Sequence, residues 1–368
     1  MAQTTPQPRY IGTDPLQKQF ASAVRRNVNA YFKENNISTK ADIRLVPKTI
    51  ALLAMYFAPL VMLVTVPMSA WWLVPLNIVM GIGLAGIGMS MMHDGVHGAV
   101  SNKQWLNKAM GSCMVLLGST VFTWKILHNV NHHTHTNVDE HDQDIDPPAI
   151  LRFSDHAPLK PIHRIQHVLA WFLYGLLTVT KIINDYFTLA RFSKQGITKQ
   201  HGINVPWEFV SMTITKILVI FMFIGLPLLL TDFMWWQVLL GFALMHFVAG
   251  LIMGSVFQLA HVVEGTEQPL PNSEGIIEAD WAVHEMRTTA NFAPRNRLVN
   301  WYVGGLNYQV EHHLFPHISH LHYSAIAPIV ERTAREHNVP YTCKPTLRAA
   351  LRSHFRRLYQ LGHEEHPA

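Results

Sequence analysis

The chain has 368 residues, of which 49% are hydrophobic and only 14% are charged. The hydrophobic residues are concentrated in long runs, which argues against an ordinary soluble domain and indicates a membrane protein. The formal net charge of +5 comes largely from segments that flank these runs, so the charge fits a membrane surface and gives no indication of nucleic-acid binding. Cys113 and Cys343 are the only cysteines, which excludes a disulfide framework and a thiolate metal site.

The apolar runs follow a polar beginning. Residues 1–45 are predicted to be a polar cytoplasmic segment, and no secretory signal is visible in them. From Thr49 to Met92 there is no Asp, Glu, Lys or Arg, and this run can hold two membrane helices with a tight turn between them. A second uncharged run extends from Phe233 to Val263, after the apolar segment Ile217 to Leu230.

Three histidine clusters lie beside these runs. They read His93-Asp94-Gly95-Val96-His97, His128-Asn129-Val130-Asn131-His132-His133 and Gln309-Val310-Glu311-His312-His313. Spacing alone is weak evidence in a chain with 23 histidines. However, histidine is costly beside hydrocarbon unless it is paired or bound, and neutral imidazole is a common ligand of transition metals. The clusters therefore predict a metal centre at the membrane edge, provided that they meet in the folded chain.

The topology follows from requiring all three clusters on one side of the membrane. The short uncharged segment Ala109 to Trp124 separates the first two clusters, so it cannot cross alone. Three apolar segments separate the second and third clusters, so an even number must cross, and the short Ile165 to Thr180 is interpreted as interfacial or partly inserted. The predicted spans are residues 50–70, 72–92, 211–231 and 235–257.

Charge and aromatic residues support this arrangement. The two turns on the far side, Pro67 to Trp72 and Thr231 to Trp236, contain a single charged residue, Asp232, and each contains a tryptophan pair. By the positive-inside rule, the clusters and both termini are predicted on the cytoplasmic side of a bacterial inner membrane or the endoplasmic reticulum. The predicted fold class is all-α: an integral membrane protein with four transmembrane helices and a cytoplasmic helical cap that carries a histidine-rich di-metal site.

Helical spacing selects the ligands. Residues three or four apart share one face of an α-helix, and each cluster has such a pair. His261 stands just past the fourth span, in a matching position. The predicted metal ligands are His93, His97, His128, His132, His133, His261, Gln309, His312 and His313.

The number of donors indicates two metal ions. Zinc sites use four ligands at most, whereas eight or nine donors suit two five- or six-coordinate ions. Iron is the best chemical choice, because imidazole suits it and open positions allow oxygen to bind. The zinc-protease motif is absent, since His284-Glu285-Met286-Arg287-Thr288 lacks the second histidine. No catalytic residue separate from the metal centre is predicted.

Acidic residues beside the clusters are expected to accept the free ring N–H of ligating imidazoles. For the run from Glu140 to Asp146 a solvated acidic loop is an equal alternative. The candidates are Asp94, Glu140, Asp142, Asp144, Asp146 and Glu311.

The three clusters resemble the histidine boxes of the membrane fatty acid desaturases. The stretch Gly304 to Pro316, with Gln309 opening the third box, is similar to the "front-end" and acyl-CoA or acyl-lipid branch, and Asn307 within it is expected to support the ligands. The segments His128 to Pro148 and Asp280 to Phe292 are similar as well. The resemblance implies a desaturase domain over residues 46–360, followed by a polar tail, 361–368.

This resemblance implies a di-iron enzyme that uses O2 and two electrons to insert a cis double bond into the acyl chain of an acyl-CoA or a phospholipid. The sequence has no His-Pro-Gly-Gly haem motif of a fused cytochrome b5, so a separate donor, a ferredoxin or a cytochrome b5, is expected. A fatty acyl hydroxylase on the same scaffold is the alternative. A metal transporter would place its ligands near the bilayer midplane, and a haem protein needs only two histidines.

Other polar residues have simpler interpretations. His246 is predicted to form a structural hydrogen bond inside the fourth span, and His135, His317, His320 and His322 are expected to be solvated or to support the ligands. A basic helix is predicted from near Thr346, with arginines that face solvent or lipid or, alternatively, dock an acidic electron carrier. These arginines are Arg348, Arg352, Arg356 and Arg357.

Overall fold

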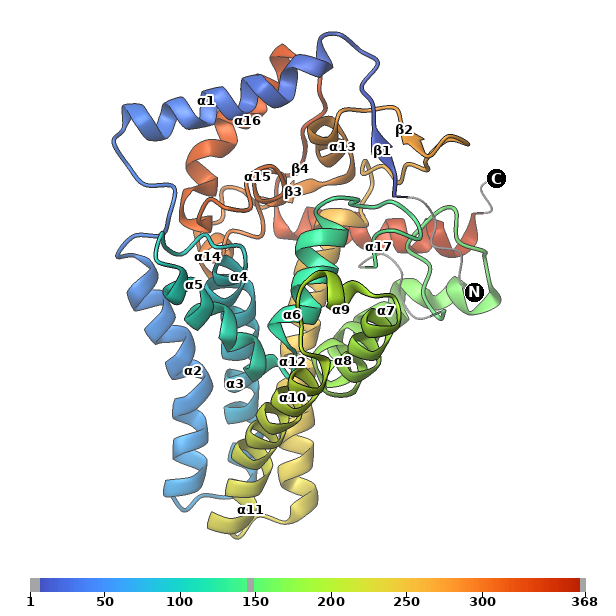
Figure 1. The fold of residues 1–368 in the computed structure, drawn as a ribbon. Helices are drawn as coiled ribbons and strands as arrows, with labels where there is room; N and C mark the ends of the chain where they lie inside the picture. The colour runs from blue at the N-terminus through green and yellow to red at the C-terminus, as the bar shows by residue number, and fades with distance from the viewer. Residues whose placement is uncertain (1–6, 144–148, 365–368) are drawn as a thin grey trace. The chain divides into compact units, whose positions relative to one another are not determined.

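A computed structural model of the chain describes residues 7–143 and 149–364 and is mostly helical (Figure 1). It divides into two compact units. Unit 1 comprises Met1–Asp42, Ile126–Ala170 and Val256–Ala368, and unit 2 comprises Ile43–Lys125 and Trp171–Ser255. Each unit is therefore built from segments that are far apart in the sequence.

Unit 2 contains the long apolar helices. Its helices, some of which continue into unit 1, are α2 (Leu45–Thr65), η2 (Ala70–Trp72), α3 (Leu73–Ile87), η3 (Gly88–Met92), α4 (His93–Val96), α5 (Gln104–Gly111), η4 (Ser112–Leu117), α6 (Val121–Trp124), α7 (Gln166–Gly175), α8 (Leu177–Lys194), α9 (Ile197–Gln200), α10 (Val205–Ile220), η7 (Phe221–Gly225), α11 (Leu226–Leu230) and α12 (Trp235–His261).

Unit 1 contains shorter helices and two pairs of parallel strands, β1 with β2 and β3 with β4. Besides the start of α7 and the end of α12, its elements are β1 (Arg9–Tyr10), η1 (Gln17–Gln19), α1 (Phe20–Glu34), η5 (Lys125–His132), η6 (Pro161–Ile165), β2 (Ile276–Ile277), α13 (Trp281–Thr288), β3 (Ala290–Phe292), α14 (Arg297–Tyr302), α15 (Gln309–Leu314), η8 (His320–His322), α16 (Tyr323–Glu336), β4 (Thr342–Lys344) and α17 (Leu347–His363).

Four helical segments are long and apolar enough to cross a membrane, which confirms the predicted number. They are Leu45–Thr65, Ala70–Val96, Val205–Leu230 and Trp235–His261. The two short segments that were predicted not to cross alone each lie in a helix pair bent by more than 40°, and counting each pair as one span would raise the number to six. Because each pair is sharply bent, neither segment forms a single straight helix long enough to span.

The first span begins earlier than predicted. Lys48 directly precedes the uncharged run in the sequence, yet it lies inside α2 with only 2% of its surface exposed. Its ammonium interacts electrostatically with Asp94, which is also 2% exposed. A buried charge is tolerated in a protein when an opposite charge lies beside it. The helix can therefore begin before Lys48 instead of after it.

Unit 2 is held together by close helix packing and by a buried hydrogen bond. His246 in α12 is fully buried, and its Nδ1 lies 3.1 Å from the hydroxyl of Thr178 in α8, as expected for a structural histidine. One turn further along α12, a Cβ added at Gly250 would lie 2.6 Å from the backbone oxygen of Tyr174 and 2.7 Å from that of Gly175. Small residues permit this approach of two backbones inside a membrane protein.

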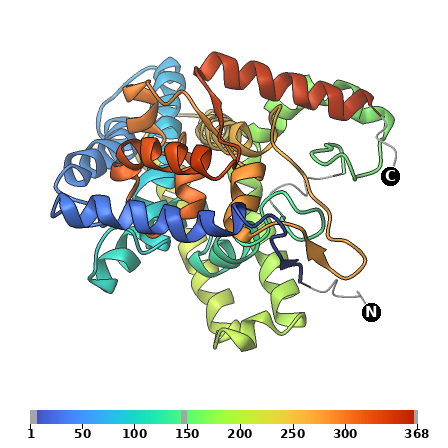
Figure 2. The same ribbon diagram turned by 90° about the horizontal axis from the view of Figure 1, so that it is seen from above.

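The N-terminal segment belongs to the core of unit 1. Phe20, Val24, Val28 and Phe32 repeat at every fourth position of α1 and are buried in one cluster with residues of α13, α15 and α16. The helices α1 and α16 lie side by side in both views (Figure 1, Figure 2). Residues 1–45 thus contain an amphipathic helix whose apolar stripe is concealed by the polar average of the segment.

Replacing Gly250 by alanine should destabilise the chain by about 1–3 kcal/mol, because the added methyl meets backbone atoms that cannot move aside. The thermal unfolding midpoint of the purified protein in detergent measures this loss. Ala243→Val on the exposed side of the same helix is the control, since it adds volume at an exposed position. An equal loss in both variants would show that the close approach at Gly250 is not the cause.

Candidate metal centre

The second histidine cluster begins on a π-helical turn, η5, and its last residue, His133, directly follows that turn. The N–H of His133 donates to the carbonyl of His128 at 3.0 Å, so residues five apart come into register. As a result all three histidines of the cluster gather on one side, whereas α-helical spacing accounts only for His128 and His132. Their ring centroids lie 5.2 Å (His128 to His132), 4.8 Å (His128 to His133) and 5.6 Å (His132 to His133) apart.

Histidines from three elements of unit 1 converge on one point. His132 comes from η5, His261 ends α12, and His313 lies in α15. One ring nitrogen from each lies within 4.8 Å of the others, and all three side chains are buried. The structure thereby brings together three of the predicted ligands from distant parts of the sequence, in a geometry that can hold a metal ion.

Buried carboxylates hold two of these rings. Asp142 Oδ2 lies 2.9 Å from Nδ1 of His132, and Glu285 Oε2 lies 2.7 Å from Nδ1 of His313. The hydroxyl of Thr136 donates to the same Glu285 oxygen at 2.8 Å. A carboxylate that accepts the Nδ1–H of an imidazole fixes the tautomer in which Nε2 carries the lone pair for a metal.

The remaining ring nitrogens fit a cation. Among the described residues, both ring nitrogens of His261 and Nε2 of His313 are buried without a hydrogen-bond partner. Burial, assisted by neighbouring imidazoles, lowers the pKa of His313 well below its usual value, so the ring is neutral, as a ligand must be. Burial also raises the pKa of the Glu285 carboxyl to about 8, and a bound cation would favour its ionised form.

A second group of predicted ligands lies next to the first within unit 1. The ring of His312 in α15 is 4.6 Å from that of His133 and 6.0 Å from that of His128. Nδ1 of His312 lies 3.2 Å from the hydroxyl of Tyr323, which fixes that ring in turn. Gln309, at the start of α15, is 2% exposed.

The first cluster belongs to unit 2. A π-helical turn, η3, directly precedes His93, and the rings of His93 and His97 are 4.7 Å apart. Both rings contact Trp124 edge-on, at 5.7 Å and 6.0 Å respectively. The two histidines thus form a pair on one face, as their spacing predicts.

The residues predicted to support the ligands have different surroundings. The Glu311 carboxylate accepts hydrogen bonds from Asn291 at 2.8 Å and Tyr341 at 2.9 Å, and Asn307 Nδ2 lies 3.5 Å from the carbonyl of Ala293. Asp94 interacts with Lys48. Within the acidic run, Asp142 is buried at His132, whereas Glu140 is exposed. Asp144 and Asp146 lie outside the described residues.

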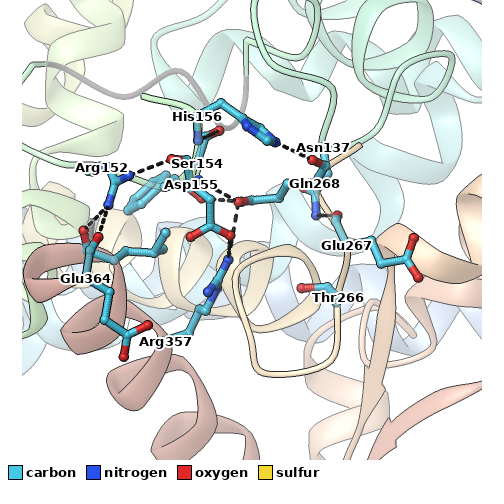
Figure 3. Close-up of polar contacts among 12 residues, drawn as sticks. Asn137, Arg152, Ser154, Asp155, His156, Thr266, Glu267, Gln268, Arg357 and Glu364 are labelled. Carbon is cyan, nitrogen blue, oxygen red and sulfur yellow. Dashed lines mark hydrogen bonds and ion pairs between the residues drawn. The ribbon is translucent and has the colours of Figure 1, made fainter. Parts of the chain in front are cut away.

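Sequence reasoning missed Glu285 and Asn137. Glu285 belongs to a His-Glu pair that was set aside because the zinc-protease motif is incomplete, and its role depends on a tertiary contact with His313. Asn137 has a positive φ of 59°, and its side-chain amide donates to the carbonyls of His261, Glu267 and Thr288 at 2.9, 3.1 and 3.1 Å. Figure 3 shows Asn137 beside the loop that contains Glu267. This one amide ties the second cluster to the end of α12.

Comparisons with known proteins identify the family of the chain. The fatty acid desaturase family model matches residues 69–345. An sn-1 linoleoyl-lipid 6-desaturase of Arthrospira platensis is 35% identical over 91% of this chain and 90% of its own length. An acyl-lipid (8-3)-desaturase of Physcomitrium patens is 34% identical over 95% of this chain and 73% of its own length. A further sn-1 linoleoyl-lipid 6-desaturase, from Synechocystis, is 32% identical over 94% and 96%. The chain therefore belongs to the fatty acid desaturase family.

Proposed function

We propose that this membrane desaturase inserts a cis double bond into the fatty acyl chain of a membrane lipid, with O2 as co-substrate, at a centre of two histidine-ligated iron ions. The observation that carries the proposal is the buried triad of His132, His261 and His313, two of whose rings are held by carboxylates. A lipid-bound substrate is favoured over acyl-CoA because the relatives described above are named for acyl-lipid substrates.

We propose that all nine predicted residues are metal ligands. His132, His261 and His313 would hold one ion, and the other predicted ligands of unit 1 supply donors for a second. His93 and His97 are assigned to the same centre from the three-box pattern of the family. When bound, the irons supply the oxidising power that an unactivated C–H bond requires.

The described residues contribute orientation and exclusion of water. Asp142 and Glu285 keep the Nδ1 protons of their imidazoles in place, and Thr136 holds the Glu285 oxygen that does so. All of these side chains are buried, so the ligands are shielded from solvent. We further propose a cytoplasmic position of the site from the positive-inside pattern, and a separate ferredoxin or cytochrome b5 as the electron donor.

The fatty acids of a heterologous host that expresses the chain with a suitable donor should include a new unsaturated acid, detectable by gas chromatography and mass spectrometry. His312→Ala should abolish it, because a ligand is lost, whereas His363→Ala on the exposed end of α17 should retain it. A hydroxylated acid in place of the unsaturated one would contradict the proposal and indicate an oxygenase.

Glu285→Ala should lower metal affinity or turnover by about 10–100-fold, since the Nδ1 proton of His313 loses its acceptor. Two measurements test this: the iron retained after dialysis against a chelator, and the turnover per chain. Glu278→Ala, which removes an exposed carboxylate of unit 1, is the matched control. If Glu285→Ala retained as much iron as the control, the carboxylate would have no role in holding the ligand.

A further inference from the structure

The outer face of α17 combines positive charge with exposed aromatic rings. Phe355 is 41% exposed and Tyr359 is 48% exposed, although the helix is attached to a folded core. Helical spacing places these rings among the arginines at positions three, four and seven apart. The face, called here the α17 outer face, consists of Arg348, Arg352, Phe355, Arg356 and Tyr359.

The opposite side of α17 is fixed to unit 1. The Nδ1 of His354 lies 2.6 Å from the carbonyl of Val262, and the hydroxyl of Ser353 accepts the N–H of Glu264 at 3.0 Å. Figure 3 shows the contacts at the C-terminal end, where Arg357 forms an ion pair with Asp155. The helix therefore cannot rotate to bury its aromatic rings, and the α17 outer face stays exposed.

The end of the helix is held in the same way by a buried arginine. Arg152 is 3% exposed and donates through its guanidinium to the carbonyl of Leu361 at 2.7 Å and that of Glu364 at 3.1 Å. These bonds satisfy carbonyls that a helix leaves open at its C-terminus (Figure 3). Contacts from Ser353 to Glu364 thus fix the C-terminal half of α17.

An apolar surface continues from α17 onto its neighbour. The ring of His167, in the first turn of α7, contacts Phe355 at 5.0 Å and Tyr359 at 5.2 Å. Further apolar residues of the same segment are exposed, namely Ile162 at 38%, Ile165 at 55% and Val168 at 62%. Aromatic and aliphatic side chains that are exposed together on neighbouring segments are typical of a surface that contacts a partner or a membrane.

The charges indicate which partner. The arginines at positions 348, 352 and 356 have no ion-pair partner among the described residues of the chain. Arginine beside aromatic and aliphatic residues on one helical face is the pattern of helices that lie in a membrane interface and bind anionic lipid. An acidic soluble carrier would match the arginines but would leave Ile165 and Val168 facing water.

We propose that the α17 outer face, together with the exposed apolar residues of η6 and α7, binds the surface of a bilayer that contains anionic lipid. The aromatic rings enter the boundary between head groups and acyl chains, and the arginines contact lipid phosphates. α17 then anchors unit 1 to the membrane surface.

A spin label tests this position directly. The label is placed at Phe355→Cys in a chain that carries Cys113→Ser and Cys343→Ser and is reconstituted in nanodiscs with phosphatidylglycerol. Its collision rate with O2 should exceed that with a water-soluble nickel chelate, because O2 concentrates in lipid. A label at Arg332→Cys, exposed on α16, should show the reverse. A label at residue 355 that matched this control would overturn the proposal.

A second experiment varies the charge of the lipid and uses the chain without a spin label. Hydrogen exchange across α17 should slow at least several-fold in phosphatidylglycerol nanodiscs relative to phosphatidylcholine. Arg352→Glu with Arg356→Glu should remove that difference, whereas Arg332→Glu with Arg335→Glu, the same charge change on α16, should retain it. Protection that appeared only on adding an acidic electron carrier, whatever the lipid, would overturn the lipid proposal and assign the face to the carrier.

Discussion

The metal centre depends on the burial of neutral imidazoles next to carboxylates that hold one nitrogen of each ring. Left alone in a protein interior, several histidines so close together would lose the hydrogen bonds that water provides, at a cost for every nitrogen. Asp142 and Glu285 satisfy Nδ1 of His132 and His313, and a bound cation would satisfy the buried ring nitrogens that lack a partner among the described residues. The arrangement is thus costly without a metal and favourable with one.

The rest of unit 1 serves to keep these groups in place. Thr136 and Asn137 follow directly on the second cluster, and their hydrogen bonds connect it to α13 and to the end of α12. The hydrophobic core beneath α13 and α15 is completed by α1, so residues near the start of the chain stabilise ligands near its end.

Long apolar runs and box-like spacing were sufficient to predict the four spans and the family, because both signals are local in sequence. Features that depend on tertiary contacts were beyond such reasoning. Glu285 acquires its role only through contact with His313, and Lys48 is tolerated in the first span only because Asp94 lies near it. The π-helical turn that gathers His128, His132 and His133 departs from the regular helical period on which the ligand prediction was based.

The metal content of the purified chain, produced with ample iron and measured by elemental analysis, tests the proposed di-iron centre most directly. We expect about two iron ions per chain, since the donors exceed what a single ion can use. Iron should be lost from His132→Ala but retained in His363→Ala, whose imidazole lies on the exposed end of α17. Stoichiometric zinc in place of iron, or iron that is unaffected by His132→Ala, would contradict the central claim.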